Sequence, residues 1–324
     1  MKFNWKKEFK ESNEWLARES NRRLLYEMQM QEIRELLSND VTLDSVESIS
    51  PRLGRLAFWH GQKAFQGATA TSEVSAINWS VYFDYIRHSM RMRVLRIEQP
   101  NGNGNIGAYE IHSHFTLLLG IGLVDEAIWL GQHIYDSIKR RMKQPVVWTL
   151  LEISEADLDR PIASDDDSLD LNSDNISGYS KSPLCGLVLK MWLVLTGRRE
   201  PMDRLPEKAP QCGIYDPLFE HWDHLEKLTA AISTACDFHL RRMNDDRKIR
   251  HDIAEFRRSP FREVPFEILA YRNLRRHLGL ETPFPAHPLL DSPFVKSLPE
   301  EITPSGDPLL AEVLEYARKV LPNL

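Results

Sequence analysis

Cysteine is scarce in this sequence of 324 residues, which has three: Cys185, Cys212 and Cys236. They are widely spaced, and no two form a CxxC pair. An odd number of distant cysteines argues against a disulfide framework and is typical of a protein kept in a reducing compartment. The cysteine pattern therefore favours the cytoplasm.

Long apolar runs are also missing. The longest, "LCGLVLKMWLVLTG", is interrupted by Lys190 and is too short to cross a bilayer, so we interpret it as a buried helix. The N-terminal stretch "MKFNWKKEFKESNEWL" lacks the apolar core of a signal peptide. The sequence predicts a soluble cytoplasmic protein that does not contact membranes.

The sequence has no excess of positive charge and lacks the common catalytic motifs. Its net charge is −6, so nucleic acid is not an expected partner. GxSxG, SxxK, GxGxxG, HExxH and the kinase motifs are absent. The glycine-rich stretch "QPNGNGNIG" lacks the Lys and Ser/Thr of a phosphate-binding loop. We therefore expect no cofactor, no small-molecule substrate and no catalytic residues.

Helical periodicity runs through most of the chain, whereas strand patterns are scarce. The sequence predicts an all-α fold of antiparallel helix pairs packed into a compact multi-helix domain, with long irregular acidic and proline-rich loops. Helices are expected at 4–37, from about Pro51, at 73–98, at 108–142 with a short Gly-containing turn inside, at 184–195, from Asp216 onward, at 247–259 (a short charged helix), at 264–279 and at 308–320. The expected organisation is an N-terminal helical part (1–142), an acidic loop (143–182) and a C-terminal helical part (183–324), or one continuous domain made of both helical parts.

The acidic loop is the most unusual stretch of the chain. Residues 152–174 carry nine acidic residues and one arginine. Part of the loop has the spacing of a calcium-binding EF-hand, but Lys181 stands where the bidentate glutamate is needed. The remaining interpretations are a flexible loop, a contact with the basic segment 241–262 of the same chain, and a docking surface for a basic protein. For the docking surface, the candidate partner-binding residues are Asp165, Asp166, Asp167, Asp170 and Asp174.

Two histidine-containing motifs are weaker candidates for chemistry. In "EHWDH", His221 and His224 lie three residues apart beside Asp223, which is helical spacing for two metal ligands without an evident third. In "CDFH", Cys236 and His239 have the same spacing, but the preceding run of small residues is typical of close helix packing. We interpret Cys236 as structural and expect no metal site, with the three "EHWDH" residues as the alternative.

The C-terminal third carries a resemblance. The segments "TACDFHLRRM", "REVPFEIL" and "PFEILAYRNLRRHLGLETPFPAHPLLDSPF" give a helix, an "LGL" turn, a proline-punctuated "HPLL" stretch and a closing "DPLL" helix. Over residues 216–321 this resembles the mostly helical immunity proteins of bacterial polymorphic toxin and type VI secretion systems. The resemblance implies a cytoplasmic, non-enzymatic protein that binds one cognate toxin domain, one-to-one, and occludes its active site; the acidic loop would suit a basic toxin such as a nuclease.

Two other classes of function stay open from the sequence alone. The first is a helical metal-dependent hydrolase that uses His221, Asp223 and His224. The second is a helical scaffold or regulatory binding protein with several partners. A single tight partner favours the immunity protein over both.

Overall fold

The computed structural model describes residues 18, 21, 23–67, 76–98, 108–141, 183–197, 212–245, 256, 259–298, 307–322 and 324. Within these ranges every regular element is a helix and no strand is present, which confirms the all-α fold class. None of the helices described is both long enough and apolar enough to cross a membrane.

The chain divides into two compact units that do not follow its linear order. Unit 1 consists of Met1–Gly104, Leu240–Pro265 and Ala286–Leu324, and unit 2 consists of Asn105–His239 and Phe266–Pro285. The sequence predicted an N-terminal helical part (1–142), an acidic loop (143–182) and a C-terminal helical part (183–324), or one continuous domain made of both helical parts. Each compact unit combines segments from both of those parts.

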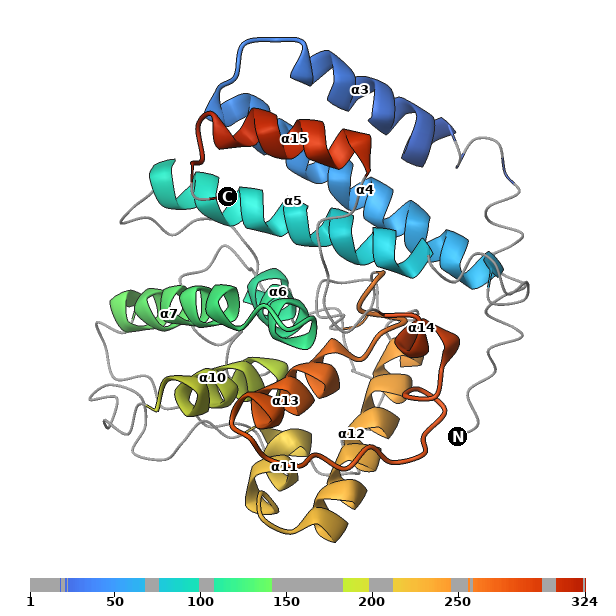
Figure 1. Ribbon diagram of the computed structural model, residues 1–324, viewed down its shortest axis with the longest axis vertical. Coiled ribbons are helices and arrows are strands. Elements are labelled where there is room, and N and C mark those ends of the chain that lie inside the picture. Colours follow the sequence, from blue (N-terminus) through green and yellow to red (C-terminus); the bar gives the residue numbers. More distant parts are fainter. Residues whose placement is uncertain are drawn as a thin grey trace, which may run out of the picture. The chain divides into compact units, whose positions relative to one another are not determined.

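Unit 1 is built around a long helical hairpin (Figure 1). Its elements are the π-helical turn η1 (Arg23–Glu27), α3 (Met28–Leu37), α4 (Leu43–Gly67), α5 (Ala76–Glu98), α14 (Pro293–Lys296) and α15 (Pro308–Arg318). Helices α4 and α5 are antiparallel, because Ser50 and Gly54 contact Arg87 whereas Ala57 and Gly61 contact Ser80. The core between them is formed by fully buried side chains such as Leu53 and Val81.

Unit 2 contains the expected pair of helices joined by a glycine turn. Its elements are α6 (Ala108–Gly120), α7 (Val124–Arg141), α10 (Pro183–Thr196), the 3-10 turn η2 (Gly213–Tyr215), α11 (Asp216–Glu220), α12 (Leu225–Asp245, in unit 2 up to His239) and α13 (Phe266–His277). Trp192 of α10 donates a hydrogen bond to the Ile128 carbonyl of α7 and stacks on Tyr135, with ring centroids 5.1 Å apart. These contacts fix α10 against α7.

Helix α4 begins earlier than the sequence predicted. Its start at Leu43 is set by reciprocal hydrogen bonds: the Ser45 amide donates to the Thr42 hydroxyl oxygen (3.0 Å), and the Thr42 amide donates to the Ser45 hydroxyl oxygen (2.9 Å). Pro51 lies inside the helix. The prediction of a start near Pro51 was therefore wrong. The Thr42 and Ser45 side chains cap the helix at Leu43, well before the proline, which the helix then accommodates in its interior.

The expected long helix from Asp216 is interrupted. Helix α11 ends at Glu220, residues 221–224 form a turn, and α12 begins at Leu225. By contrast, α13 begins directly after Pro265 and ends as predicted, with Gly279 at φ 71° and the Leu280 amide donating to the Arg275 carbonyl. The turn at 221–224 is held by α13, whose Arg275 side chain donates a hydrogen bond to the Trp222 carbonyl.

Candidate functional site

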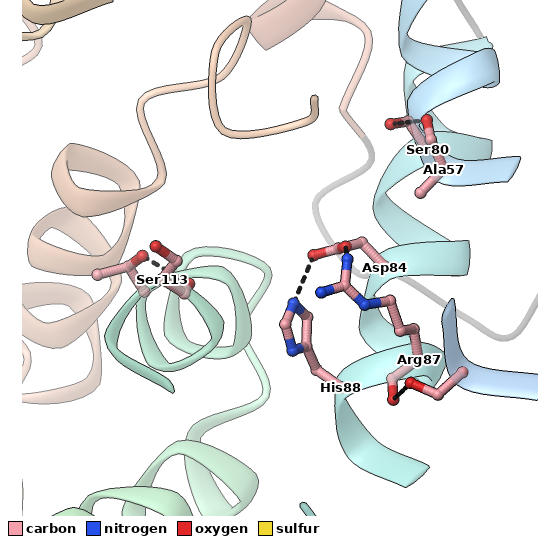
Figure 2. A network of polar contacts seen from close by, with 8 residues as sticks. Ala57, Ser80, Asp84, Arg87, His88 and Ser113 are labelled. Carbon is pink, nitrogen blue, oxygen red and sulfur yellow. Dashed lines mark hydrogen bonds and ion pairs between the residues drawn. The ribbon is translucent and has the colours of Figure 1, made fainter. Parts of the chain in front are cut away.

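In the described part of unit 1, a group of buried ionisable side chains lies on α5. Asp84, Arg87 and His88 occupy positions i, i+3 and i+4, so all three project from neighbouring faces of the helix (Figure 2). Their exposed fractions are 2%, 8% and 3%. Charged side chains are rarely buried unless they are paired. The contacts of these three side chains therefore show whether they stabilise the fold or are available to a ligand.

The Asp84 carboxylate contacts both of its neighbours. One oxygen accepts a hydrogen bond from the Arg87 guanidinium at 3.2 Å, and the other lies 3.4 Å from Nε2 of His88. The Arg87 backbone carbonyl accepts a hydrogen bond from the Ser50 hydroxyl of α4, at 3.2 Å. Among the described residues, only one carboxylate oxygen thus has a hydrogen bond, from the guanidinium, whereas the other lies near the imidazole without one. The Ser50 contact joins the group to α4.

Small residues on α4 make room for this polar face of α5. A Cβ on Gly54 would lie 2.8 Å from Cδ of Arg87, and a Cβ on Gly61 would lie 2.2 Å from Cβ of Ser259. Between them, the Ala57 carbonyl accepts a hydrogen bond from the Ser80 hydroxyl at 2.6 Å. The two glycines, one heptad apart, let polar side chains occupy a helix contact that is usually apolar.

A second buried carboxylate lies in the segment next to Gly61. Glu263 is fully buried and accepts a hydrogen bond from the Ser259 hydroxyl at 2.7 Å. Ser259 itself is 4% exposed. Because Ser259 also packs against Gly61, this pair continues the polar contacts of the α4–α5 hairpin. The buried polar groups of unit 1 thus hold its helices together.

In unit 2, a buried polar contact joins α12 to α13. Nδ1 of His239 lies 2.8 Å from Oε1 of Glu267, and both side chains are buried. Such a contact is strong in a low-dielectric interior and leaves a costly unpaired group if one partner is removed. It therefore fixes how these two helices pack.

Cys236 lies one helical turn before His239 and near the same carboxylate. Burial raises the pKa of its thiol far above the usual range, and the negative charge of Glu267 raises it further. A nucleophilic cysteine needs the opposite environment, with a lowered pKa and access to solvent. The geometry supports the structural role expected for Cys236.

A stack of rings and cations lies where α10, α11 and α13 meet. Lys190 sits over the Phe219 ring at 4.7 Å, Phe219 stacks on Trp222 with an interplanar angle of 9°, and Arg275 sits over Trp222 at 4.7 Å. Tyr271 meets both aromatic rings edge-on. Cations over aromatic faces attract the ring electrons, and edge-on rings are favourable, so the stack is a stable unit.

Two side chains of α13 hold the backbone beside this stack. The Tyr271 hydroxyl donates to the Leu218 carbonyl, and burial raises the pKa of Tyr271 to about 12. The Arg275 guanidinium donates to the Trp222 carbonyl at 2.7 Å and twice to the Glu281 carbonyl, at 3.0 and 2.6 Å. Arg275 is buried, so these three hydrogen bonds replace its hydration. They fix both the 221–224 turn and the segment after α13.

The structure places the residues of the alternative metal site in that turn. His221 is partly buried, and Asp223 and His224 are exposed. They are not on one face of a helix, because the helix is interrupted there. Among the described residues, no group of three or more His, Cys, Asp or Glu side chains is arranged to hold a metal ion. The candidate partner-binding residues Asp165, Asp166, Asp167, Asp170 and Asp174 and the EF-hand spacing lie outside the described residues.

Sequence reasoning missed the buried charges on α5 and the ring stack. The first was detectable in "DYIRH", where an acid, an arginine and a histidine share helical spacing inside an aromatic-rich stretch. The stack was not, because Lys190, Phe219 and Arg275 come from three separate segments. No family model, curated protein or solved structure matches this chain.

Proposed function

We propose that this chain is an immunity protein that binds one cognate toxin domain of a bacterial polymorphic toxin or type VI secretion pair in the cytoplasm. It acts by occupying the toxin's active site and performs no chemistry itself. The toxin carries a basic surface, as a nuclease does for its substrate. The complex is one-to-one.

One observation carries the proposal. The two sequence segments behind the resemblance, "TACDFHLRRM" and "VPFEIL", meet through the buried contact between His239 and Glu267. The residues that suggested an immunity protein are thus those that join α12 to α13. A binding protein needs such a rigid scaffold, because a surface that is already ordered loses less entropy when its partner docks.

The environment of the described titratable groups also favours binding over catalysis. Cys236 and Tyr271 have pKa values raised by burial, and Asp84 and Glu263 are committed to internal contacts. These groups stabilise the fold. The contact with the toxin is assigned to the acidic residues between α7 and α10, whose charge would speed association with a basic partner.

Co-purification with the product of the adjacent gene tests the proposal. The expected result is a one-to-one complex with a Kd in the nanomolar range or below, and survival of cells that express both proteins when the product alone is toxic. Charge reversal of Asp165, Asp166, Asp167 and Asp170 together should weaken binding by at least about tenfold at low salt and reduce its salt dependence.

Two outcomes would contradict the proposal at different points. If the adjacent product neither binds nor is neutralised, the immunity function is wrong. If the complex forms but the charge-reversed protein binds with unchanged affinity and salt dependence, the acidic residues are not its interface. Reversal of Glu35 on α3 and Glu312 on α15 is a control, since both side chains are exposed and lie in helices that have no assigned role in binding the toxin.

A further inference from the structure

A groove of about 520 Å³ lies between α5 and α15 in unit 1. Helix α5 lines it with Tyr82 and Ile86, both of which are buried. Helix α15 lines it with five side chains, namely Leu310, Ala311, Leu314, Glu315 and Arg318. Sites that bind small molecules have volumes of this size, combine apolar walls with a few polar groups, and occur between helices. The lining of the groove therefore indicates what it could bind.

Helical spacing places most of the α15 lining on one face. Ala311, Leu314, Glu315 and Arg318 stand at positions i, i+3, i+4 and i+7, which neighbour one another on the surface of a helix. Val313, on the other side of α15, is fully buried and holds the helix in the core of unit 1. The groove is therefore open to solvent along the outer face of α15, and a ligand can enter it without movement of the core.

The lining of α15 changes from apolar to charged along the helix. Leu310, Ala311 and Leu314 come first, and Glu315 and Arg318 follow. Residues 310 and 318 are separated by about 12 Å along the helix axis, at a rise of about 1.5 Å per residue. A molecule that follows α15 through the groove thus meets apolar side chains at one end and both charges at the other. The fitting ligand has an apolar body and a charged head.

The two charged side chains define the head. Nε of Arg318 donates a hydrogen bond to the Leu324 carbonyl at 2.9 Å, which orients the guanidinium. Its two terminal nitrogens form the edge that binds a carboxylate with two parallel hydrogen bonds. The Glu315 carboxylate, in the same groove, attracts an ammonium group and repels a carboxylate. A head that carries both charges is attracted at both positions, whereas a head with a single charge is repelled at one of them.

We propose that this groove binds a free α-amino acid with a large apolar side chain. The carboxylate of the ligand binds Arg318, its ammonium group binds Glu315, and its side chain lies against Leu310 and Leu314 of α15 and Ile86 of α5. A free amino acid carries both charges on one carbon atom, as the pair of protein side chains requires. The assignment does not depend on the proposed function, because the site lies within unit 1 and needs no partner protein.

The test is isothermal titration calorimetry of the full chain with L-phenylalanine and two analogues. N-acetyl-L-phenylalanine keeps the carboxylate but has no ammonium group, and L-phenylalanine amide keeps the ammonium group but has no carboxylate. The expected result is saturable binding of L-phenylalanine to a single site on each chain. Each analogue should bind more weakly by about fivefold or more, because it loses one charged hydrogen-bonded contact and keeps the repulsive one.

Variants of α15 locate the site. Arg318→Gln and Glu315→Gln should each weaken L-phenylalanine binding by about fivefold or more, and Ala311→Trp, which adds a ring to the lining, by about tenfold or more. Glu312→Gln and Lys319→Gln are matched controls, since both side chains are exposed and neither lines the groove; they should stay within about twofold of wild type. All five changed side chains are exposed, so the thermal unfolding midpoints should stay within a few degrees of the wild-type value.

Three outcomes would overturn the proposal. If L-phenylalanine does not bind up to its solubility limit, the groove does not take such an amino acid. If L-phenylalanine binds wild type and Ala311→Trp equally, it binds elsewhere on the chain. If either analogue binds as tightly as L-phenylalanine, the requirement for both charges is wrong. A groove that binds no amino acid, but in which Ala311→Trp weakens the complex with the product of the adjacent gene, would be a protein contact instead.

Discussion

His60 should make the stability of unit 1 depend on pH. This side chain of α4 stacks on Phe83 with ring centroids 5.2 Å apart and an interplanar angle of 8°. Burial lowers its pKa from 6.5 to about 4; the nearby charge of Asp307 acts in the opposite direction, and that of Lys63 lowers the pKa slightly further. In the folded protein, His60 is therefore neutral at pH values where it is charged in the unfolded chain.

The sign follows from which state binds the proton. Between pH 6.5 and 4 the unfolded chain is protonated at His60 and the folded protein is not, so the free energy of unfolding rises with pH and falls on acidification. The full effect of a shift from 6.5 to about 4 is roughly 3.4 kcal/mol, at 1.36 kcal/mol per pH unit. Between pH 7.5 and 4.5, about 2.5 kcal/mol of it should be lost.

Urea unfolding followed by circular dichroism, at intervals from pH 7.5 to 4.5, measures this dependence. The comparison is with His60→Gln, which cannot titrate. The substitution changes the packing on Phe83, but that cost does not depend on pH, so the difference in slope isolates His60. Parallel pH profiles for the two proteins would refute the reasoning, because they would mean that His60 is protonated equally in both states.

Three further predictions concern the internal contacts. Gly61→Ala should destabilise the protein by about 1–3 kcal/mol in urea unfolding, because the added Cβ would lie 2.2 Å from Cβ of Ser259; an undisturbed midpoint would mean that Ser259 moves freely. Glu267→Leu should cost about 1–3 kcal/mol, since His239 loses its buried partner, whereas Glu267→Gln, which keeps an oxygen acceptor, should cost less. Cys236 should react with a thiol reagent only in denaturant, and rapid labelling of the native protein would contradict its burial.

Local sequence rules predicted elements whose ends are set by their own residues. Helix α13 lies between Pro265 and Gly279, and the pair α6–α7 is divided by a turn containing Gly122 at φ 86°. Proline and glycine act on the backbone directly, through a fixed φ and through access to positive φ. Such boundaries do not require knowledge of the rest of the fold.

The interruption between α11 and α12 could not be predicted in this way. Residues 216–245 have helical periodicity throughout, yet the backbone turns at 221–224. There, Tyr271 and Arg275 bind the carbonyls of Leu218 and Trp222, which lie 53 residues earlier in each case. The partner that stabilises the turn is distant in sequence, so only the folded structure identifies it.

The candidate sites were also only partly predictable, because the sequence shows the spacing of their residues but not the distant contacts that place them. The spacing of Asp84, Arg87 and His88 is visible in the sequence, but their burial depends on Gly54 of another helix, which leaves space for the Arg87 side chain. His221, Asp223 and His224 looked suited to a metal because a continuous helix would place His221 and His224 on one face. The turn removes that arrangement, and the prediction of no metal site is left to direct metal analysis.

Burial decides which charged side chains contribute to the stability of the fold. In unit 1, the buried carboxylates of Asp84 and Glu263 bond to neighbours within the same unit, so changing them alters the fold. In unit 2, the Arg275 side chain is buried and binds the backbone carbonyls of Trp222 and Glu281, whereas the side chain of the next residue, Arg276, is exposed. Two adjacent arginines thus have different roles. Arg275→Met should lower the free energy of unfolding by about 2 kcal/mol or more, since two segments lose their anchor, whereas Arg276→Glu should leave it nearly unchanged, since that side chain is exposed. Equal destabilisation by both substitutions in urea unfolding would refute this reasoning, because it would mean that Arg276 supports the fold as much as Arg275 does.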